Sequence, residues 1–175
     1  RDRDAMVREP SVKTSLLPQD LHRASALDNL TRAIGAQEAI EYWKSAPYLL
    51  NFMKGYKLKE QFNEHLESQA DLSEPLTAMA PHLLNEDSIR QYDKIDPGNS
   101  RLRALIDRTL SKDEWKLLWL PPSLPYIHSE VMADRSALTK SLVFSTWSVV
   151  PDVIAAVCSY TAERERVRVA GLTDY

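Results

Sequence analysis

The stretch from Lys140 to Arg166 limits most strongly what this chain can fold into. It begins with the unbroken apolar run Leu142–Phe144, continues through Ser145 and Thr146, and then becomes a long apolar-rich segment. An uninterrupted apolar run is typical of a strand buried on both faces, as in a parallel sheet covered by helices. Pro151 is tolerated in a first helical turn, and apolar residues follow it at three- and four-residue spacing. The stretch therefore predicts a strand, a polar turn and a buried helix.

Such a strand needs a second strand beside it. The best candidate is Leu117–Leu120, a short apolar run that Pro121 and Pro122 terminate. Between the two strands, Ile127–Thr139 provides enough residues for a loose crossover connection, so the pair is expected to be parallel. Because the chain offers few other strand candidates, the residues by themselves suggest a part of something larger.

Helical periodicity dominates the chain before these strands. Apolar residues recur on one side of segments 16–34, 36–44, 57–70 and 100–110. Pro18 lies in the first turn of the first segment and Gly35 follows its end, which is the usual order for a helix. Ser100 is expected to cap the last helix. The acidic stretch 71–96 is interrupted by prolines, so it is expected to hold short helices and loops.

These patterns predict a mainly α fold of the α+β class. A helical block is expected over residues 1–112, followed over residues 113–175 by a small parallel two-stranded β element with a covering helix. The predicted core consists of Leu27, Leu30, Trp43, Phe52, Phe62, Leu105, Leu118, Trp119, Val143, Phe144, Ile154 and Val157.

The segment Tyr42–Tyr56 is the most aromatic part of the sequence and contains Pro47. Aromatic rings in such a segment can stack nucleotide bases or bind a partner. Rings on both sides of a proline corner can equally anchor neighbouring helices in a core. We favour this second interpretation.

Composition and charge exclude several classes of protein. A chain of 175 residues with 43% hydrophobic residues can bury a core of its own. Its formal net charge of −3 argues against a surface that binds polyanions everywhere, but leaves room for a local basic face. No apolar run is long enough to span a bilayer and no signal peptide is recognisable, so we expect a cytoplasmic protein without membrane contact. Cys158, the only cysteine, is expected to be a small buried side chain and not a reactive thiol.

The common motifs for catalysis, metals and cofactors are missing. The four glycines are widely separated, so the chain contains neither a G-x-x-x-x-G-K phosphate loop nor a G-x-G-x-x-G turn. The four histidines lie apart, without an H-E-x-x-H motif or a cysteine pair. Ser123 and His128 lack the G-x-S-x-G elbow of a hydrolase. No catalytic residue, metal ligand or cofactor-binding residue is therefore predicted in this chain.

Three segments resemble a known family. YWKSAPYLLNFM (residues 42–53), LLWLPPSLPY (117–126) and TKSLVFSTWSVVPDVIAAVCSYTAERE (139–165) are similar to large bacterial superfamily 2 helicases of the Swi/Snf type, often described as helicase-related proteins. The three segments resemble the region of those helicases that lies between the two RecA-like motor lobes, together with the opening of the second lobe. The third segment resembles helicase motif IV, in which the polar end of a strand faces the nucleic-acid backbone.

The resemblance implies that the chain is a fragment of an ATP-dependent DNA helicase or translocase. Residues 1–112 would supply the helical inter-lobe region, and residues 113–175 the start of the second RecA-like lobe. ATP, Mg²⁺ and the hydrolase activity are then implied only for the full-length parent, and this chain alone is expected to be inactive. DNA and the remaining helicase lobes are the implied partners. Surface that faces those lobes could make the fragment self-associate.

Four residues are the predicted nucleic-acid contacts: Ser145, Thr146, Trp147 and Lys140. Hydroxyl and backbone N–H groups at a strand-to-helix turn can bind a phosphate, and Lys140 could add a backbone contact. Trp147 is either a stacking platform or a core plug, and we favour the plug.

The alternative is a helical interaction module whose aromatic corner, residues 43–52, binds a protein partner without touching nucleic acid. A salt-dependent affinity for DNA would favour the motor fragment, whereas salt-insensitive association with a partner or with itself would favour the module.

Overall fold

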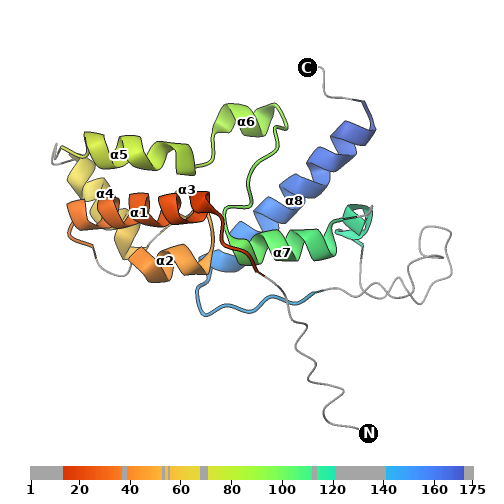
Figure 1. Cartoon of the computed structure of the whole chain (residues 1–175), viewed down its shortest axis with the longest axis horizontal. Helices are drawn as coiled ribbons and strands as arrows, with labels where there is room; N and C mark the ends of the chain where they lie inside the picture. The colour runs from red at the N-terminus through yellow and green to blue at the C-terminus, as the bar shows by residue number, and fades with distance from the viewer. Residues whose placement is uncertain are drawn as a thin grey trace, which may run out of the picture.

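The computed structural model describes residues 14–36, 39–52, 54, 56–67, 71–111, 114–120 and 141–171. Every regular element in these ranges is helical. Figure 1 shows a group of helices from the first part of the chain, with the long helix α8 packed along one side. The mainly helical part of the prediction is therefore confirmed, whereas its β element is not.

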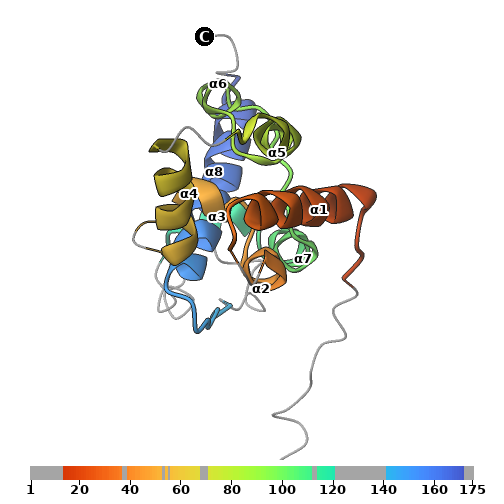
Figure 2. The same cartoon turned by 90° about the vertical axis from the view of Figure 1, so that its left-hand side faces the viewer.

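Helix α1 (Pro18–Ala33) begins and ends where the sequence predicts. Proline occupies its first turn, and the Asp20 carboxylate accepts a hydrogen bond of 2.9 Å from the backbone N–H of Leu17, which a helix start leaves unpaired. Gly35 follows the helix with φ +65°, a left-handed conformation that favours glycine. Figure 2 shows α1 between α5 on one side and α2 and α7 on the other. Its buried face contributes Leu27 and Leu30 to the core.

Three helices follow around the aromatic corner. They are α2 (Ala39–Ser45), α3 (Leu49–Phe52) and α4 (Lys57–Glu67). Tyr42 and Tyr48 are buried, and Trp43, Phe52 and Tyr56 pack against the core as half-buried side chains. The corner therefore anchors neighbouring helices, as the favoured interpretation expected.

The acidic stretch forms short helices, as predicted. These are α5 (Ser73–Met79), the 3₁₀ turn η2 (Ala80–His82) and α6 (Glu86–Arg90). Helix α7 (Ser100–Thr109) comes next, but its cap is Asn99 and not Ser100: the Asn99 side chain accepts hydrogen bonds from the backbone N–H groups of Arg101 and Leu102. An asparagine caps as well as a serine, so the neighbouring residue satisfies the same unpaired N–H groups.

Helix α8 (Val149–Val169) confirms the long buried helix predicted after Thr146. It packs against α3 and against the 3₁₀ helix η3 (Glu114–Leu117). Its buried side chains belong to the same hydrophobic cluster as those of α1, α2 and α7: Val149, Val150, Val153, Val157, Cys158 and Ala162. The expectation that Cys158 is buried is thus confirmed.

The predicted two-stranded β element is wrong. Residues 114–117 form the 3₁₀ helix η3, and the chain turns at residues 118 and 119. The other predicted strand, residues 142–145, is an irregular connection at the surface before α8 (Figure 1). Leu142 and Phe144, which would share one face of a strand, are 81% and 88% exposed, and Val143 on the other face is 41% exposed, so neither face of the segment is buried between helices. A short apolar run can become a strand only if another strand supplies its backbone hydrogen bonds, and within the described residues none does.

The predicted core is partly correct. Leu27, Leu30 and Val157 are buried, and six others pack against the core as half-buried side chains: Trp43, Phe52, Phe62, Leu105, Leu118 and Ile154. Trp119, Val143 and Phe144 are exposed, which corrects their assignment. All three lie in the two segments that do not form strands, so the burial expected from a covered sheet is lost with the sheet.

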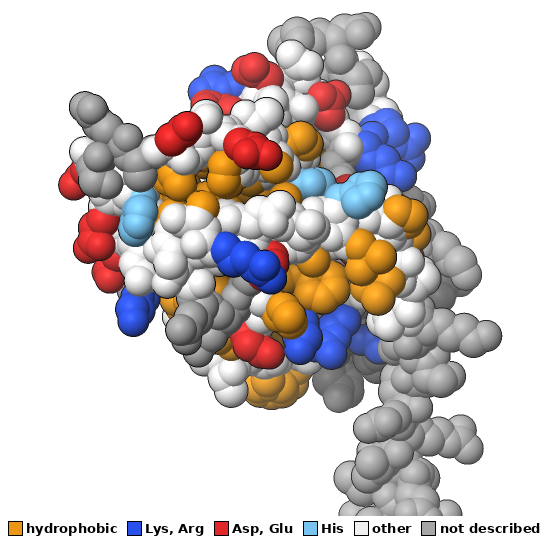
Figure 3. Space-filling view, turned by 60° about the vertical axis from the view of Figure 1, so that its left-hand side comes forward, with side chains coloured by type: hydrophobic (Ala, Val, Ile, Leu, Met, Phe, Trp, Pro, Cys, Tyr) orange, Lys and Arg blue, Asp and Glu red, His pale blue; other side chains and the backbone are white. Residues whose placement is uncertain are grey.

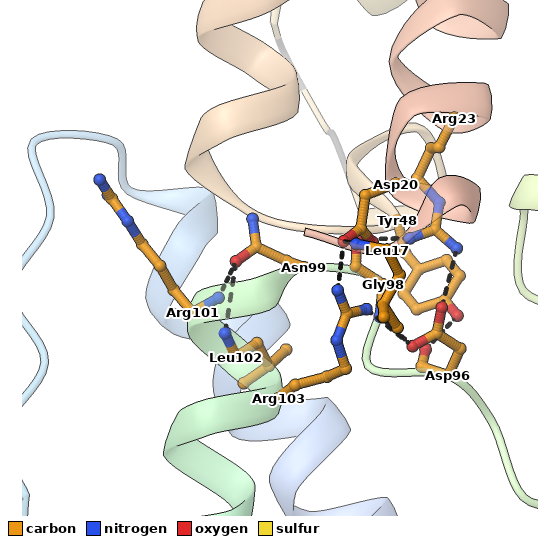
Figure 4. Close-up of polar contacts among 10 residues, drawn as sticks. All are labelled: Leu17, Asp20, Arg23, Tyr48, Asp96, Gly98, Asn99, Arg101, Leu102 and Arg103. Carbon is orange, nitrogen blue, oxygen red and sulfur yellow. Dashed lines mark hydrogen bonds and ion pairs between the residues drawn. The ribbon is translucent and has the colours of Figure 1, made fainter. Parts of the chain in front are cut away.

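A partly buried ionic network links the start of α1 to the start of α7 (Figure 4). Arg103 forms ion pairs with Asp20 and, at 3.1 Å, with Asp96. Arg23 lies 3.8 Å from the Asp96 carboxylate, donates a hydrogen bond to the backbone carbonyl of Gly98, and stacks over the Tyr48 ring at 5.2 Å from its centroid. The network fixes the loop before α7 against α1, and it thereby positions Asn99 and Arg101.

Among the helices that the structure describes, none is long and apolar enough to cross a lipid bilayer.

Candidate binding groove

A surface groove lies where α2, α7 and the first turns of α8 meet. It has a volume of about 640 Å³, and the connection before α8 forms one of its walls. We call it the α2–α7–α8 groove. Its lining residues are Glu41, Lys44, Ser45, Ala46, Pro47, Asn99, Arg101, Leu102, Leu105, Val143, Phe144, Ser145, Thr146, Val150 and Ile154.

The groove combines apolar and polar lining groups. Leu102 and Val150 are buried, and Leu105 and Ile154 are half-buried, so these side chains offer an apolar surface. The hydroxyl groups of three residues and the amide of Asn99 provide hydrogen-bonding groups. A surface of this kind can bind a ligand that has both apolar and polar parts.

Two cations line the groove. Lys44 on α2 lies 3.4 Å from Glu41, but both side chains are more than half exposed, so this pair contributes little stability and leaves the ammonium group accessible. The exposed Arg101 guanidinium, at the start of α7, forms no ion pair with any residue that the structure describes. The described lining of the groove therefore carries two positive charges and one negative charge.

Two of the predicted nucleic-acid contacts, Ser145 and Thr146, lie in this groove with exposed side chains. The Ser145 hydroxyl accepts a hydrogen bond of 3.1 Å from the backbone N–H of Trp147, and its own proton can still be donated to a ligand. Lys140 lies outside the described residues.

Trp147 packs inside the molecule beside the groove. It is half-buried, stacked on Tyr56 at a centroid distance of 6.1 Å, and tilted against Tyr42 at 5.1 Å. These contacts favour the core plug over the stacking platform.

Tyr56 also fixes the turn that carries Ser145 and Thr146. Its hydroxyl lies 2.7 Å from the Ser148 hydroxyl and accepts a hydrogen bond of 3.1 Å from the backbone N–H of Val149. This N–H is one of those that a helix start leaves unpaired, so the tyrosine takes the place of a conventional capping residue. The N-terminus of α8 is thereby held against the aromatic corner.

Sequence reasoning missed Lys44, Asn99 and Arg101 as site residues. The Pro97-Gly98-Asn99 sequence marked a turn before a helix, and this was the only local signal near them. Lys44 belongs to an ordinary amphipathic helix. Its approach to residue 145 depends on how α2 packs, which spacing along the chain does not reveal.

A second, apolar pocket of about 310 Å³ lies between α7, η3 and α8. Cys158 lines it, and burial raises the pKa of this thiol to about 11. The thiol is therefore protonated at neutral pH, which makes it a poor nucleophile. Within the described part of the chain, no group of three or more His, Cys, Asp or Glu side chains could hold a metal ion.

Charge on the face formed by α1, α4 and α5 is mixed. Figure 3 shows acidic and basic side chains on this face with apolar patches between them. A wide basic surface is not seen there. A polyanion could contact only small groups of basic side chains, such as the pair that lines the α2–α7–α8 groove.

Comparison with protein-family models, with curated proteins and with solved structures found no match. The function proposed for this chain must therefore rest on the chemistry of its own residues and on the resemblance of its segments.

Proposed function

We propose that this chain is the helical region of an ATP-driven motor that acts on DNA, and that it contacts the nucleic-acid backbone in the α2–α7–α8 groove. ATP and Mg²⁺ would be bound by other parts of the motor. The observation that carries the proposal is the position of Ser145 and Thr146. The packing of α2 and α7 brings Lys44 and Arg101 into the same groove as these two hydroxyl groups.

The chemistry of the groove suits a phosphate backbone. Arginine and lysine supply charge to phosphate oxygens, and hydroxyl and amide groups donate hydrogen bonds that set the register of the strand. Glu41 opposes binding, but its contact with Lys44 reduces its effect. With only two cations, the affinity is expected to be modest and to fall as salt rises.

A salt titration of DNA binding tests this proposal. Binding of fluorescein-labelled duplex and single-stranded DNA would be followed by fluorescence anisotropy from low to physiological salt. The Lys44→Ala/Arg101→Ala variant is expected to make the negative slope of log affinity against log salt shallower by about 0.7 to 0.9 per cation removed. The Ser145→Ala/Thr146→Ala variant is expected to weaken binding by about three- to tenfold with an unchanged slope, because it removes no charge.

The matched control is the Lys54→Ala/Lys57→Ala variant, which removes two exposed lysines outside the groove. It should change the slope much less than the groove variant does. Equal slopes for the two double variants would move the contact away from the groove. If the wild-type chain does not bind DNA even at low salt, the proposed contact is wrong.

A second candidate function is protein docking. Leu142 and Phe144 are 81% and 88% exposed at the surface beside the two pockets, and exposed large apolar side chains that lie together commonly mark binding surfaces. In a motor they would contact the remaining lobes, and in an interaction module they would contact another protein. An isolated chain could cover them by pairing with a second copy.

Sedimentation velocity over a wide range of protein concentration tests the docking candidate. Replacing Phe144 and Leu142 by serine is expected to weaken self-association by about tenfold or more. Full burial of one such apolar side chain in an interface contributes roughly 1.5 to 3 kcal/mol to the free energy of association. Leu66→Ser, at an exposed leucine on α4, is the control and should leave the association unchanged. A monomeric wild-type chain at every concentration would rule out self-association through this surface.

A further inference from the structure

Phe144 places an exposed aromatic ring at the α2–α7–α8 groove. It is 88% exposed, and it lines the groove next to Ser145 and Thr146. Trp147, which the sequence offered as a stacking platform, instead packs against other aromatic rings inside the molecule. No other aromatic side chain belongs to the described lining of the groove. Phe144 is therefore the ring that a ligand in the groove can reach.

An exposed ring of this kind suits a flat partner. A planar group that covers Phe144 removes apolar surface from water on both sides of the contact. The faces of nucleobases are such groups, and the stacking of bases on aromatic side chains supplies much of the affinity of proteins for single strands. The surface beside the ring is also apolar, because Leu102, Leu105, Val150 and Ile154 line the same groove.

The ring and the polar groups of the groove follow one another along the chain. Phe144 directly precedes Ser145 and Thr146, and neighbouring Cα atoms are about 3.8 Å apart. Lys44 and Arg101 line the same groove with exposed side chains. A nucleotide whose base stacks on the ring can therefore direct its phosphate toward the hydroxyl groups. The neighbouring phosphates of the strand can then contact the two cations.

This combination favours a single strand over a duplex. In a duplex the faces of the bases are covered by their stacked neighbours, and exposing one of them costs the energy of unstacking and unpairing. A single strand offers base faces and phosphates together without that cost. The groove has a volume of about 640 Å³. This lies within the range of about 300 to 1,000 Å³ that is usual for pockets of drug-sized ligands, so a nucleotide fits it whereas a duplex does not.

We propose that the α2–α7–α8 groove is a site for single-stranded DNA in which one base stacks on the exposed ring of Phe144. This inference rests on the proposed function and names the form of DNA that the groove takes. Stacking does not distinguish among bases, because every base has a flat face. The site therefore recognises unpaired bases without reading their sequence.

Anisotropy titrations of the full chain with three fluorescein-labelled probes of equal length test the site. The probes are a single strand of mixed sequence, the duplex of that sequence, and a single strand in which every nucleotide is abasic. The wild-type chain is expected to bind the first probe at least about fivefold more tightly than the other two, because these offer no accessible base face. Phe144→Ala should reduce the affinity for the single strand to that for the abasic strand and leave duplex binding unchanged.

Two further variants serve as controls. Phe144→Tyr keeps the ring, so its affinity for the single strand should stay within about twofold of the wild-type value. Leu142→Ala removes an apolar side chain that is 81% exposed but does not line the groove, and it should leave all three affinities unchanged. An equal loss of single-strand binding in Leu142→Ala and Phe144→Ala would overturn the stacking contact, because it would reflect the general apolar surface before α8.

The outcomes separate this inference from the proposed function. Salt-dependent binding that is equally tight for the three probes and indifferent to Phe144→Ala would overturn the single-strand site and leave the backbone contact intact. A preference for the single strand that requires Phe144 but is unchanged in Lys44→Ala/Arg101→Ala would support stacking and overturn the backbone contact. Absence of binding to every probe at low salt would overturn both proposals.

Discussion

Replacing Arg103 by methionine is expected to lower the free energy of unfolding by about 3 kcal/mol or more. Arg103 is 17% exposed and bridges two acidic side chains, of which Asp20 is only 2% exposed. Without the guanidinium, Asp20 stays buried as a charge that only the more distant Arg23 can offset. Urea denaturation followed by circular dichroism would measure the loss.

The control for this variant is Arg101→Met on the same helix. Arg101 is exposed and forms no ion pair with any described residue, so its replacement should change the unfolding free energy by no more than about 0.5 kcal/mol. Equal losses for the two variants would mean that the ionic network contributes little.

The loss of stability caused by Arg103→Met is expected to grow as pH rises from acid to neutral. The pKa of Asp20 is lower in the folded chain than its ordinary value of 3.8. A group with a lowered pKa contributes stability at pH values above its unfolded pKa, and this contribution is lost as pH falls through the folded value. The difference between wild type and Arg103→Met should therefore be largest near neutral pH and shrink below about pH 4.

Replacing Leu117 by alanine is expected to destabilise the chain by about 2 to 5 kcal/mol. Leu117 is 2% exposed, and it is among the most completely buried large side chains that the structure describes. It ends the 3₁₀ helix η3, which packs against α8. Removing its side chain would leave a cavity at that contact, which chemical denaturation would report.

Trp119→Ala is the matched comparison, because it removes a larger apolar side chain two residues away. Trp119 is 55% exposed, so its loss should cost less than the loss of Leu117. The strand predicted from the sequence placed Trp119 in the core. A larger loss from Trp119→Ala than from Leu117→Ala would therefore restore that prediction and contradict the structure.

The sequence predicted α1, α7 and α8 because the residue patterns that form these helices are local. Apolar residues at three- and four-residue spacing form one face of a helix, and Pro18 and Gly35 mark the ends of α1 through their own backbone preferences. Even where the cap of α7 was assigned one residue too late, the turn and the helix were found. Each of these features depends on groups that lie within a few residues of one another.

The prediction of a β element was wrong because a strand, unlike a helix, depends on a distant part of the chain. An apolar run such as Leu142–Phe144 shows that a segment could be buried, but a strand also needs hydrogen bonds from a distant segment. The run at 117–120 instead turns as a 3₁₀ helix and buries Leu117 against α8. No spacing within either run reveals whether the two will meet.

The sequence by itself determined the helices and marked Ser145 and Thr146 as a polar turn before a long helix. Only the tertiary structure decided that Lys44 and Arg101 line the same groove as these two residues, and that Asp20 pairs with Arg103 across 83 positions of the chain. Local contacts are encoded in residue spacing, because the helix repeat brings positions three and four apart together. Contacts between distant residues depend on how whole helices pack, and packing selects them through the burial of many side chains at once. The α2–α7–α8 groove is a product of that packing.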